Sequence, residues 1–128
     1  MNQIEMTIPP LYLPGTVHSP RVVLDPATGT FEISGISLPE NSAIFYAPIL
    51  AWLQGFVAEN LGLTMRFHFN LEYYNSGSKM SIYKLLKVLE GLPNATVCWH
   101  YHPDDEDIRD AGHDLAQISS TPFQFIPI

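Results

Sequence analysis

The stretch Leu71–Leu89, which reads LEYYNSGSKMSIYKLLKVL, decides the fold. Its first residues end the segment Thr64–Tyr74, in which apolar and polar side chains alternate as they do along a β-strand with one buried face. Beyond the polar loop Asn75–Ser78, the apolar residues recur with the spacing of one helix face. These residues are Ile82, Leu85, Leu86 and Leu89. The stretch therefore predicts a strand that leads through a polar loop into a helix beginning near Ser78.

The polar loop places hydroxyl groups at the start of this helix. The first backbone N–H groups of a helix have no partner within it, and the helix dipole is positive at that end. A phosphate on Ser76 or Ser78 would be stabilised there. On spacing alone, however, serines at such positions act more often as caps and turn residues than as sites of modification.

Upstream, the sequence predicts a hairpin followed by a helix. The strands Arg21–Asp25 and Thr30–Gly35 flank a turn that contains Pro and Gly. A helix begins at a cap within Ser37–Ser42 and runs to about Asn60. The side chains predicted to face the core are Phe45, Ile49, Trp52, Leu53 and Phe56. The Pro-rich residues 1–20 are expected to form an extended, ordered arm without a function of its own.

Downstream, two further strands flank a third helix. One strand is predicted at Thr96–His102 and the last at Phe123–Ile126. Between them, the acidic run Asp104–Asp107 suits the positive end of a helix dipole. The order β-β-α-β-α-β-α-β predicts an α/β fold with a mixed sheet and parallel crossovers. At this length we expect a single domain over residues 1–128.

Composition narrows the classes of function. Six basic and thirteen acidic residues give a formal charge of −7, which disfavours nucleic acid and anionic membranes and favours a protein partner. No segment has the length and purity of a membrane span, and the N-terminus lacks the pattern of a secretory signal. The one cysteine, Cys98, suits a reducing compartment. We therefore expect a cytoplasmic protein.

One alternative is a metal site near His100 and His102. Two histidines at i and i+2 of a strand share a face and could bind a divalent metal together with acids from Asp104–Asp107. Polar residues at a strand end and acids that satisfy a helix dipole explain the same pattern without a metal. We favour this second explanation and keep a small metal-dependent enzyme or metal-binding protein as the alternative function.

Other catalytic patterns are absent from the sequence. The polar loop lacks the first Gly of a nucleophile elbow, and Cys98 lies within a strand pattern, a poor place for a nucleophile. The chain has neither a P-loop nor a dinucleotide-binding Gly motif. We therefore expect a protein that is not an enzyme, binds no cofactor and holds no metal.

Five segments of the chain carry a specific combination of motifs. They are SGISLPENSAIFYAPILAWL (Ser34–Leu53), LEYYNSGSK (Leu71–Lys79), VLEGL (Val88–Leu92), VCWHYHPDDEDIRDAG (Val97–Gly112) and PFQFI (Pro122–Ile126). In this order they resemble the SiaC family of bacterial regulatory phosphoproteins, which are similar in shape to STAS anti-sigma-factor antagonists. The resemblance implies a STAS-like fold for this chain.

The resemblance also implies a modification site. In the family, the residue after the loop asparagine is usually Thr and is the phosphorylated one; that position is Ser76 in this chain, with Ser78 as the reserve acceptor. Gly77 stands where the family usually has Ser.

The function implied by the resemblance is that of a binding module controlled by phosphorylation. A Ser/Thr kinase would modify the loop and a PP2C-type phosphatase would restore it. The unmodified form would bind and activate a diguanylate cyclase, and so control cyclic di-GMP synthesis and biofilm formation. The residues expected to contact the partner are Asn75, Ser76, Gly77, Ser78 and Lys79.

Overall fold

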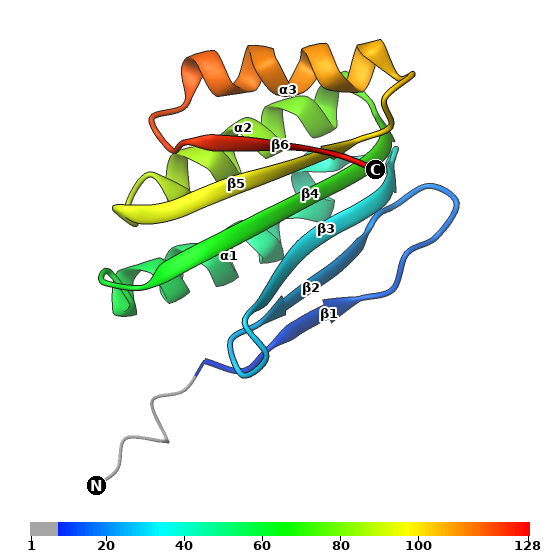
Figure 1. Cartoon of the computed structure of the whole chain (residues 1–128). Coiled ribbons are helices and arrows are strands. Elements are labelled where there is room, and N and C mark those ends of the chain that lie inside the picture. Colours follow the sequence, from blue (N-terminus) through cyan, green and yellow to red (C-terminus); the bar gives the residue numbers. More distant parts are fainter. Residues whose placement is uncertain (1–7) are drawn as a thin grey trace, which may run out of the picture.

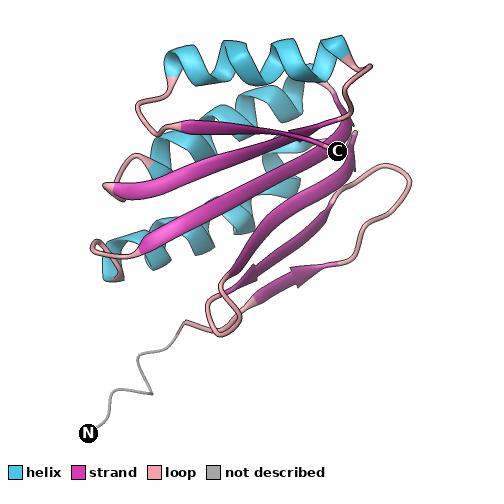
Figure 2. Ribbon diagram, viewed as in Figure 1, coloured by secondary structure: helices cyan, strands magenta, loops and turns pink. Residues whose placement is uncertain are grey.

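A mixed six-stranded sheet forms the centre of the protein in the computed structural model, which describes residues 8–128 (Figures 1 and 2). The strands lie side by side in chain order. They are β1 (Leu11–Leu13), β2 (Arg21–Asp25), β3 (Thr30–Ser37), β4 (Thr64–Tyr74), β5 (Asn94–Tyr101) and β6 (Phe123–Pro127). The pairings of β1 with β2 and of β2 with β3 are antiparallel, whereas β3, β4, β5 and β6 run parallel to one another.

Three helices connect the parallel strands and lie on one face of the sheet. They are α1 (Ser42–Glu59), α2 (Ser76–Leu89) and α3 (Glu106–Ile118). Right-handed crossovers between successive neighbouring strands place every connecting helix on the same side. Figure 1 shows α1 and α2 behind the strands and α3 along the edge formed by β6. Side chains of all three helices join those of the sheet in one buried apolar cluster.

The alternation along β4 decides which face of the sheet is buried. Met65, Phe67 and Phe69 are buried in the core, whereas Arg66 between them is exposed on the open face. Successive side chains of a strand point to opposite faces, so these three apolar residues of β4 share the face that the helices cover. The strand has the bounds predicted from the sequence, and the α/β architecture with its mixed sheet is confirmed.

The N-terminal arm contains a strand that the sequence pattern did not predict. β1 is three residues long and pairs with β2, with Leu11 opposite Leu24. Three residues between prolines are too few to show the alternation of a strand. They pair instead with the side of β2 that does not face β3, where backbone groups would otherwise lack partners, and β1 becomes the edge strand. Residues 1–7 of the predicted arm lie outside the described residues.

The buried face of α1 agrees with the prediction at Ile49, Leu53 and Phe56, which lie in the core, but differs from it at three aromatic residues. Tyr46 is fully buried, whereas Phe45 and Trp52 are partly exposed. The indole of Trp52 stacks on Phe56 at a centroid distance of 5.0 Å, and its Nε1 donates to the carbonyl oxygen of Pro9 at 2.7 Å. Apolar residues occupy every side of α1, so their spacing could not single out one buried face. By length and composition alone α1 could also cross a membrane, but a core helix of a soluble protein passes the same test.

The backbone of α3 lies in close contact with a side chain of the sheet. Gly112 faces the indole of Trp99, and a Cβ atom at this position would lie 2.5 Å from the indole Cδ1 and Nε1 atoms. The same Nε1 donates a hydrogen bond of 2.9 Å to the carbonyl oxygen of Ile108. Because Trp99 is itself buried in the core, its ring has little room to move away from a new side chain.

We therefore expect Gly112→Ala to lower the free energy of unfolding by about 1–3 kcal/mol, the usual cost of overpacking a core. The matched control is Gly55→Ala in α1, where a Cβ meets nothing within 4 Å. That substitution should raise stability by about 0.5–1 kcal/mol, because alanine favours helix more than glycine does. Urea denaturation measures both changes, and equal effects at the two positions would contradict this packing of α3.

Candidate functional site

The N-termini of α1 and α2 meet at one end of the sheet. β3 and β4 are parallel neighbours, so the helices that follow them begin at the same edge. The backbone N–H of Asn75 donates to the carbonyl oxygen of Ser37 at 3.1 Å. This bond joins the last residue of β3 to the residue between β4 and α2. The predicted polar loop therefore lies beside the start of α1.

An asparagine caps each of the two helices. Asn41 Oδ1 accepts from the N–H of Ile44 at 3.1 Å, and Asn75 Oδ1 accepts from the N–H of Ser78 at 2.8 Å. Asn75 therefore sets the start of α2 at Ser76, two residues before the start predicted from the sequence. Neither cap reaches the first two N–H groups of its helix. Two sets of first-turn N–H groups and two positive dipole ends therefore lie side by side.

A buried network of hydroxyl groups fastens this junction. Ser78 is fully buried, and its Oγ lies 2.8 Å from Ser37 Oγ and donates to the carbonyl oxygen of Ser37 at 3.0 Å. The hydroxyl of Tyr46 on α1 lies 2.7 Å from Ser37 Oγ. Burial raises the pKa of the Tyr46 phenol above its usual value, which keeps this hydroxyl protonated and able to donate. The network thus joins β3, α1 and α2 through three side chains.

Ser76 and Gly77 form the outer side of the junction. Both are exposed, in contrast to the buried Ser78. A Cβ atom added to Gly77 would lie 2.9 Å from Ser42 Oγ, so the first turns of α1 and α2 are in close contact here. The Ser76 hydroxyl therefore stands on the surface where the two helix ends meet.

A groove of about 440 Å³ lies at this junction, between α2 on one side and the start of α1 with the residues just before it on the other. It is lined by Pro39, Glu40, Asn41, Ser42, Ala43, Asn75, Ser76, Gly77, Met80, Ser81 and Lys84. We call it the α1–α2 groove. Lys79 is exposed on the same helix but does not line the groove, whereas Lys84 does. Lys79 was among the residues expected to contact the partner, whereas no sequence pattern indicated Lys84.

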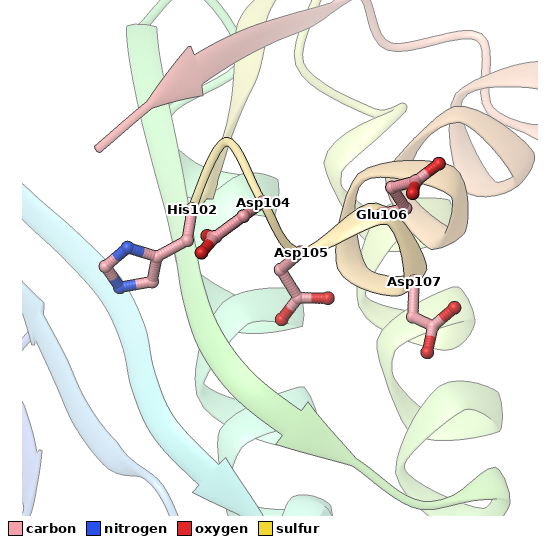
Figure 3. A pocket seen from close by; sticks show the side chains of 5 residues that line it. All are labelled: His102, Asp104, Asp105, Glu106 and Asp107. Atoms are coloured by element: carbon pink, nitrogen blue, oxygen red, sulfur yellow. The ribbon is translucent and has the colours of Figure 1, made fainter.

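The histidines of the alternative metal site lie apart from this groove. His100 faces the open side of the sheet, where its Nε2 lies 2.9 Å from Nδ1 of His68. Burial lowers the pKa of both imidazoles, and the neighbouring His100 lowers that of His68 further. His102 lies instead in a hollow with the acids of Asp104–Asp107, whose side chains point in different directions (Figure 3).

The acids of this hollow have a local structural role. Asp105 caps α3, because its Oδ1 accepts from the N–H of Ile108 at 3.1 Å. Glu106 and Asp107 occupy the first turn, where the helix dipole favours negative charge. Among residues 8–128, no group of three or more His, Cys, Asp or Glu side chains is arranged to hold a metal ion.

Comparison with known proteins identifies the family. A family model described as SiaC family regulatory phosphoprotein matches residues 13–128. The chain belongs to the SiaC family. An uncharacterized protein of Pseudomonas aeruginosa (strain UCBPP-PA14) is 29% identical over 121 residues, which cover 88% of this chain and 92% of that protein.

Solved structures of SiaC share the fold. Apo-SiaC from Pseudomonas aeruginosa is 26% identical, with a TM-score of 0.81 over 91% of this chain and 98% of that one. A second match is the complex of the diguanylate cyclase SiaD with its activator SiaC from Pseudomonas aeruginosa. The matched chain of that complex is 25% identical, with a TM-score of 0.85 over 92% of this chain and 99% of the matched one. The mixed sheet and three helices described above match these SiaC structures.

The hydroxyl network of this SiaC-family chain was not predicted from its sequence. Ser37, Tyr46 and Ser78 come from a strand and two helices, and only their meeting in the fold reveals their role. The sequence contains only a partial signal. Tyr46 is a hydroxyl-bearing residue within an otherwise apolar helix, and Ser37 and Ser78 lie in segments with capping patterns. The predicted polar loop is shorter than expected: only Asn75 stands between β4 and α2, and Ser76 and Gly77 are exposed in the first turn of the helix.

The network makes a prediction about stability. Ser78→Ala should lower the free energy of unfolding by about 1–3 kcal/mol, because it leaves buried hydroxyl and carbonyl groups with fewer hydrogen bonds. Ser76→Ala, two residues away on the same helix, should change it by less than about 0.5 kcal/mol, because the side chain is exposed. Chemical denaturation of the two variants and the wild type provides the test. A larger loss for Ser76→Ala than for Ser78→Ala would contradict these roles.

Proposed function

We propose that this chain is a non-enzymatic cytoplasmic regulator whose unmodified form binds and controls a diguanylate cyclase. A Ser/Thr kinase switches it by phosphorylating Ser76, and a PP2C-type phosphatase reverses the modification. The observation that carries the proposal is the exposed Ser76 at the junction of two helix N-termini, in the loop by which the sequence resembles the SiaC family. Membership of the family and the likeness to an activator solved with its cyclase support the choice of partner.

Accessibility favours Ser76 over Ser78 as the acceptor. A kinase has to bring the hydroxyl into its own cleft, so a buried acceptor requires local unfolding. Ser76 is exposed on the first turn of α2, whereas Ser78 is fully buried and hydrogen bonded to Ser37. A phosphate on Ser78 would also break the network that joins the two helices. It would then change the fold of the junction rather than only its surface.

Electrostatics explains how a phosphate on Ser76 would act. The modification brings about −1.5 to −2 charges to a position that is neutral in the unmodified chain. The free N–H groups of the first turns and Lys84 in the same groove can stabilise it. A partner shaped to meet a neutral hydroxyl would then bury a poorly paired anion. Phosphorylation therefore weakens binding without unfolding the protein.

The loop residues have different roles in this proposal. Asn75 holds the turn and caps α2, while Ser76 carries the modification. Gly77 allows the close approach of α1, and Lys79 is exposed beside the loop. Ser78 is buried beneath the contact surface and holds the first turn of α2 in place through its hydrogen bonds to Ser37. We assign the partner-binding surface to this loop, with Ser78 contributing indirectly.

The cyclase affinity of four forms tests the proposal: the unmodified chain, the chain phosphorylated on Ser76, Ser76→Ala and Ser76→Asp. We expect tight binding by the unmodified chain and by Ser76→Ala. Phosphorylation should weaken binding about tenfold or more, which corresponds to the loss of about 1.4 kcal/mol or more. Ser76→Asp should weaken it less, because a carboxylate carries a smaller charge than a phosphate.

The matched control is Ser120→Asp, which adds the same charge at an exposed serine beyond the C-terminus of α3. It should leave the cyclase affinity unchanged. Equal affinity of all four Ser76 forms would show that Ser76 is only a helix residue, and the phosphorylation switch at this position would be wrong. Absence of any binding to the cyclase would refute the choice of partner.

A further inference from the structure

Two histidines meet on the open face of the sheet, which the helices do not cover. His68 of β4 and His100 of β5 are both half-buried, and Nδ1 of His68 lies 2.9 Å from Nε2 of His100. The two strands are parallel neighbours in the middle of the sheet. The contact between the rings therefore adds a side-chain hydrogen bond to the backbone pairing of β4 with β5.

The number of protons on the two rings decides whether this contact can exist. A neutral imidazole has one nitrogen that donates and one that accepts, so two neutral rings form one N–H···N hydrogen bond. One added proton leaves an accepting nitrogen on the other ring, and the bond becomes charge-assisted. After a second added proton every ring nitrogen is a donor, and two positively charged N–H groups would face each other at 2.9 Å. The contact tolerates one added proton but not two.

Burial disfavours a positive charge on either ring, and the charged neighbours offer little compensation. Glu32 of β3 is in register with His68 and favours the protonated rings, but its carboxylate also forms an ion pair of 3.8 Å with Arg21 of β2. Arg66, two residues before His68 on the same face of β4, opposes the protonation of both rings. One shared anion thus competes with one nearby cation.

The other side chains beside the pair carry no charge at neutral pH. Cys98 of β5 is in register with His68, and burial raises the pKa of its thiol. Gln124 and Ile126 of β6 are in register with Cys98 and His100, and neither has a titratable group. The three helices lie on the opposite face of the sheet. A second positive charge on the pair would therefore find no free carboxylate among these neighbours.

We propose that the contact between His68 and His100 is an acid-sensitive link between β4 and β5, intact near neutral pH and broken when both rings are protonated. β4 leads directly into Asn75 and Ser76. The link therefore couples acidity to the stability of the strand that carries the candidate site. Neither phosphorylation nor the cyclase is needed for this behaviour.

The direction of the effect follows from the protons bound in the folded and unfolded states. Burial lowers the pKa of both imidazoles in the folded protein, and the neighbouring His100 lowers that of His68 further. In the unfolded chain each ring regains the ordinary pKa of about 6.5. Below that pH the unfolded chain binds more protons than the folded protein. The stability contributed by the pair is present above about pH 6.5 and is lost as the pH falls further.

NMR titration of the imidazole resonances from about pH 8 to about pH 5 tests the pair directly. In the wild type, both rings should titrate below the ordinary histidine pKa, in two linked steps. In His68→Gln, the pKa of His100 should rise toward the ordinary value, because the glutamine carries no charge. Glu32→Gln should lower the pKa of both rings further, because it removes the anion that favours their protonation.

Urea denaturation over the same pH range measures the consequence for stability. Below about pH 6.5, the midpoint of the wild type should fall more steeply with acidity than that of His68→Gln, because glutamine cannot take up a proton. The carboxylates are common to both proteins, so the difference between them isolates the pair. The matched control is His18→Gln, whose side chain is exposed in the loop between β1 and β2. It should keep the pH dependence of the wild type.

Several outcomes would overturn the link. Titration of both rings in the wild type at or above the ordinary histidine pKa would do so without any variant. An equal pH dependence of the wild type and His68→Gln would also contradict it. If His18→Gln loses as much of the pH dependence as His68→Gln, removal of any histidine has the same effect and the pair has no special role. His100→Gln replaces His68→Gln if far-UV circular dichroism shows that the latter is unfolded at neutral pH.

Discussion

The hydrogen bonds at Ser37 hold the functional end of the molecule together. The carbonyl oxygen of this residue accepts from the N–H of Asn75 and from the hydroxyl of Ser78, and its side chain contacts the phenol of Tyr46. One residue at the end of β3 thereby contacts both α1 and the start of α2. Because β3 and β4 are parallel, the two helix N-termini lie side by side and the positive potentials of their dipoles add at this end. Both the position of Ser76 and the start of the α1–α2 groove depend on this arrangement.

Acidic and basic residues are concentrated on different helices of the molecule. The chain is acidic overall, and its acids include the run that starts α3. The layer formed by α1 and α2 is instead apolar on one helix and basic on the other. A single phosphate on Ser76 would change the charge of such a surface substantially. In the proposed function, control by phosphorylation would therefore require no large movement of the fold.

Sequence patterns predicted the elements with strong periodicity. β4 has the predicted bounds because its alternation extends over eleven residues, and the change to helical spacing places α2 within two residues of its observed start. β1 was missed because three residues between prolines carry no pattern. The orientation of α1 was predicted only in part, since apolar residues surround the helix, and the burial of Tyr46 beside Ser37 could not be inferred from their spacing. The groove and its Lys84 depend on two helices packing together, which no local pattern reveals.

Hydrogen–deuterium exchange of the unmodified protein, alone and bound to the cyclase, tests the central claim most directly. The claim is that the first turns of α1 and α2 and the groove between them form the surface that the partner covers. Amides beginning at Ser42 and Ser76 should exchange more slowly in the complex, because the first N–H groups of both helices become shielded from water. The strands of the open face and α3 should exchange as in the free protein. Protection confined to the open face of the sheet or to α3, with none at the start of α1 and α2, would contradict the account.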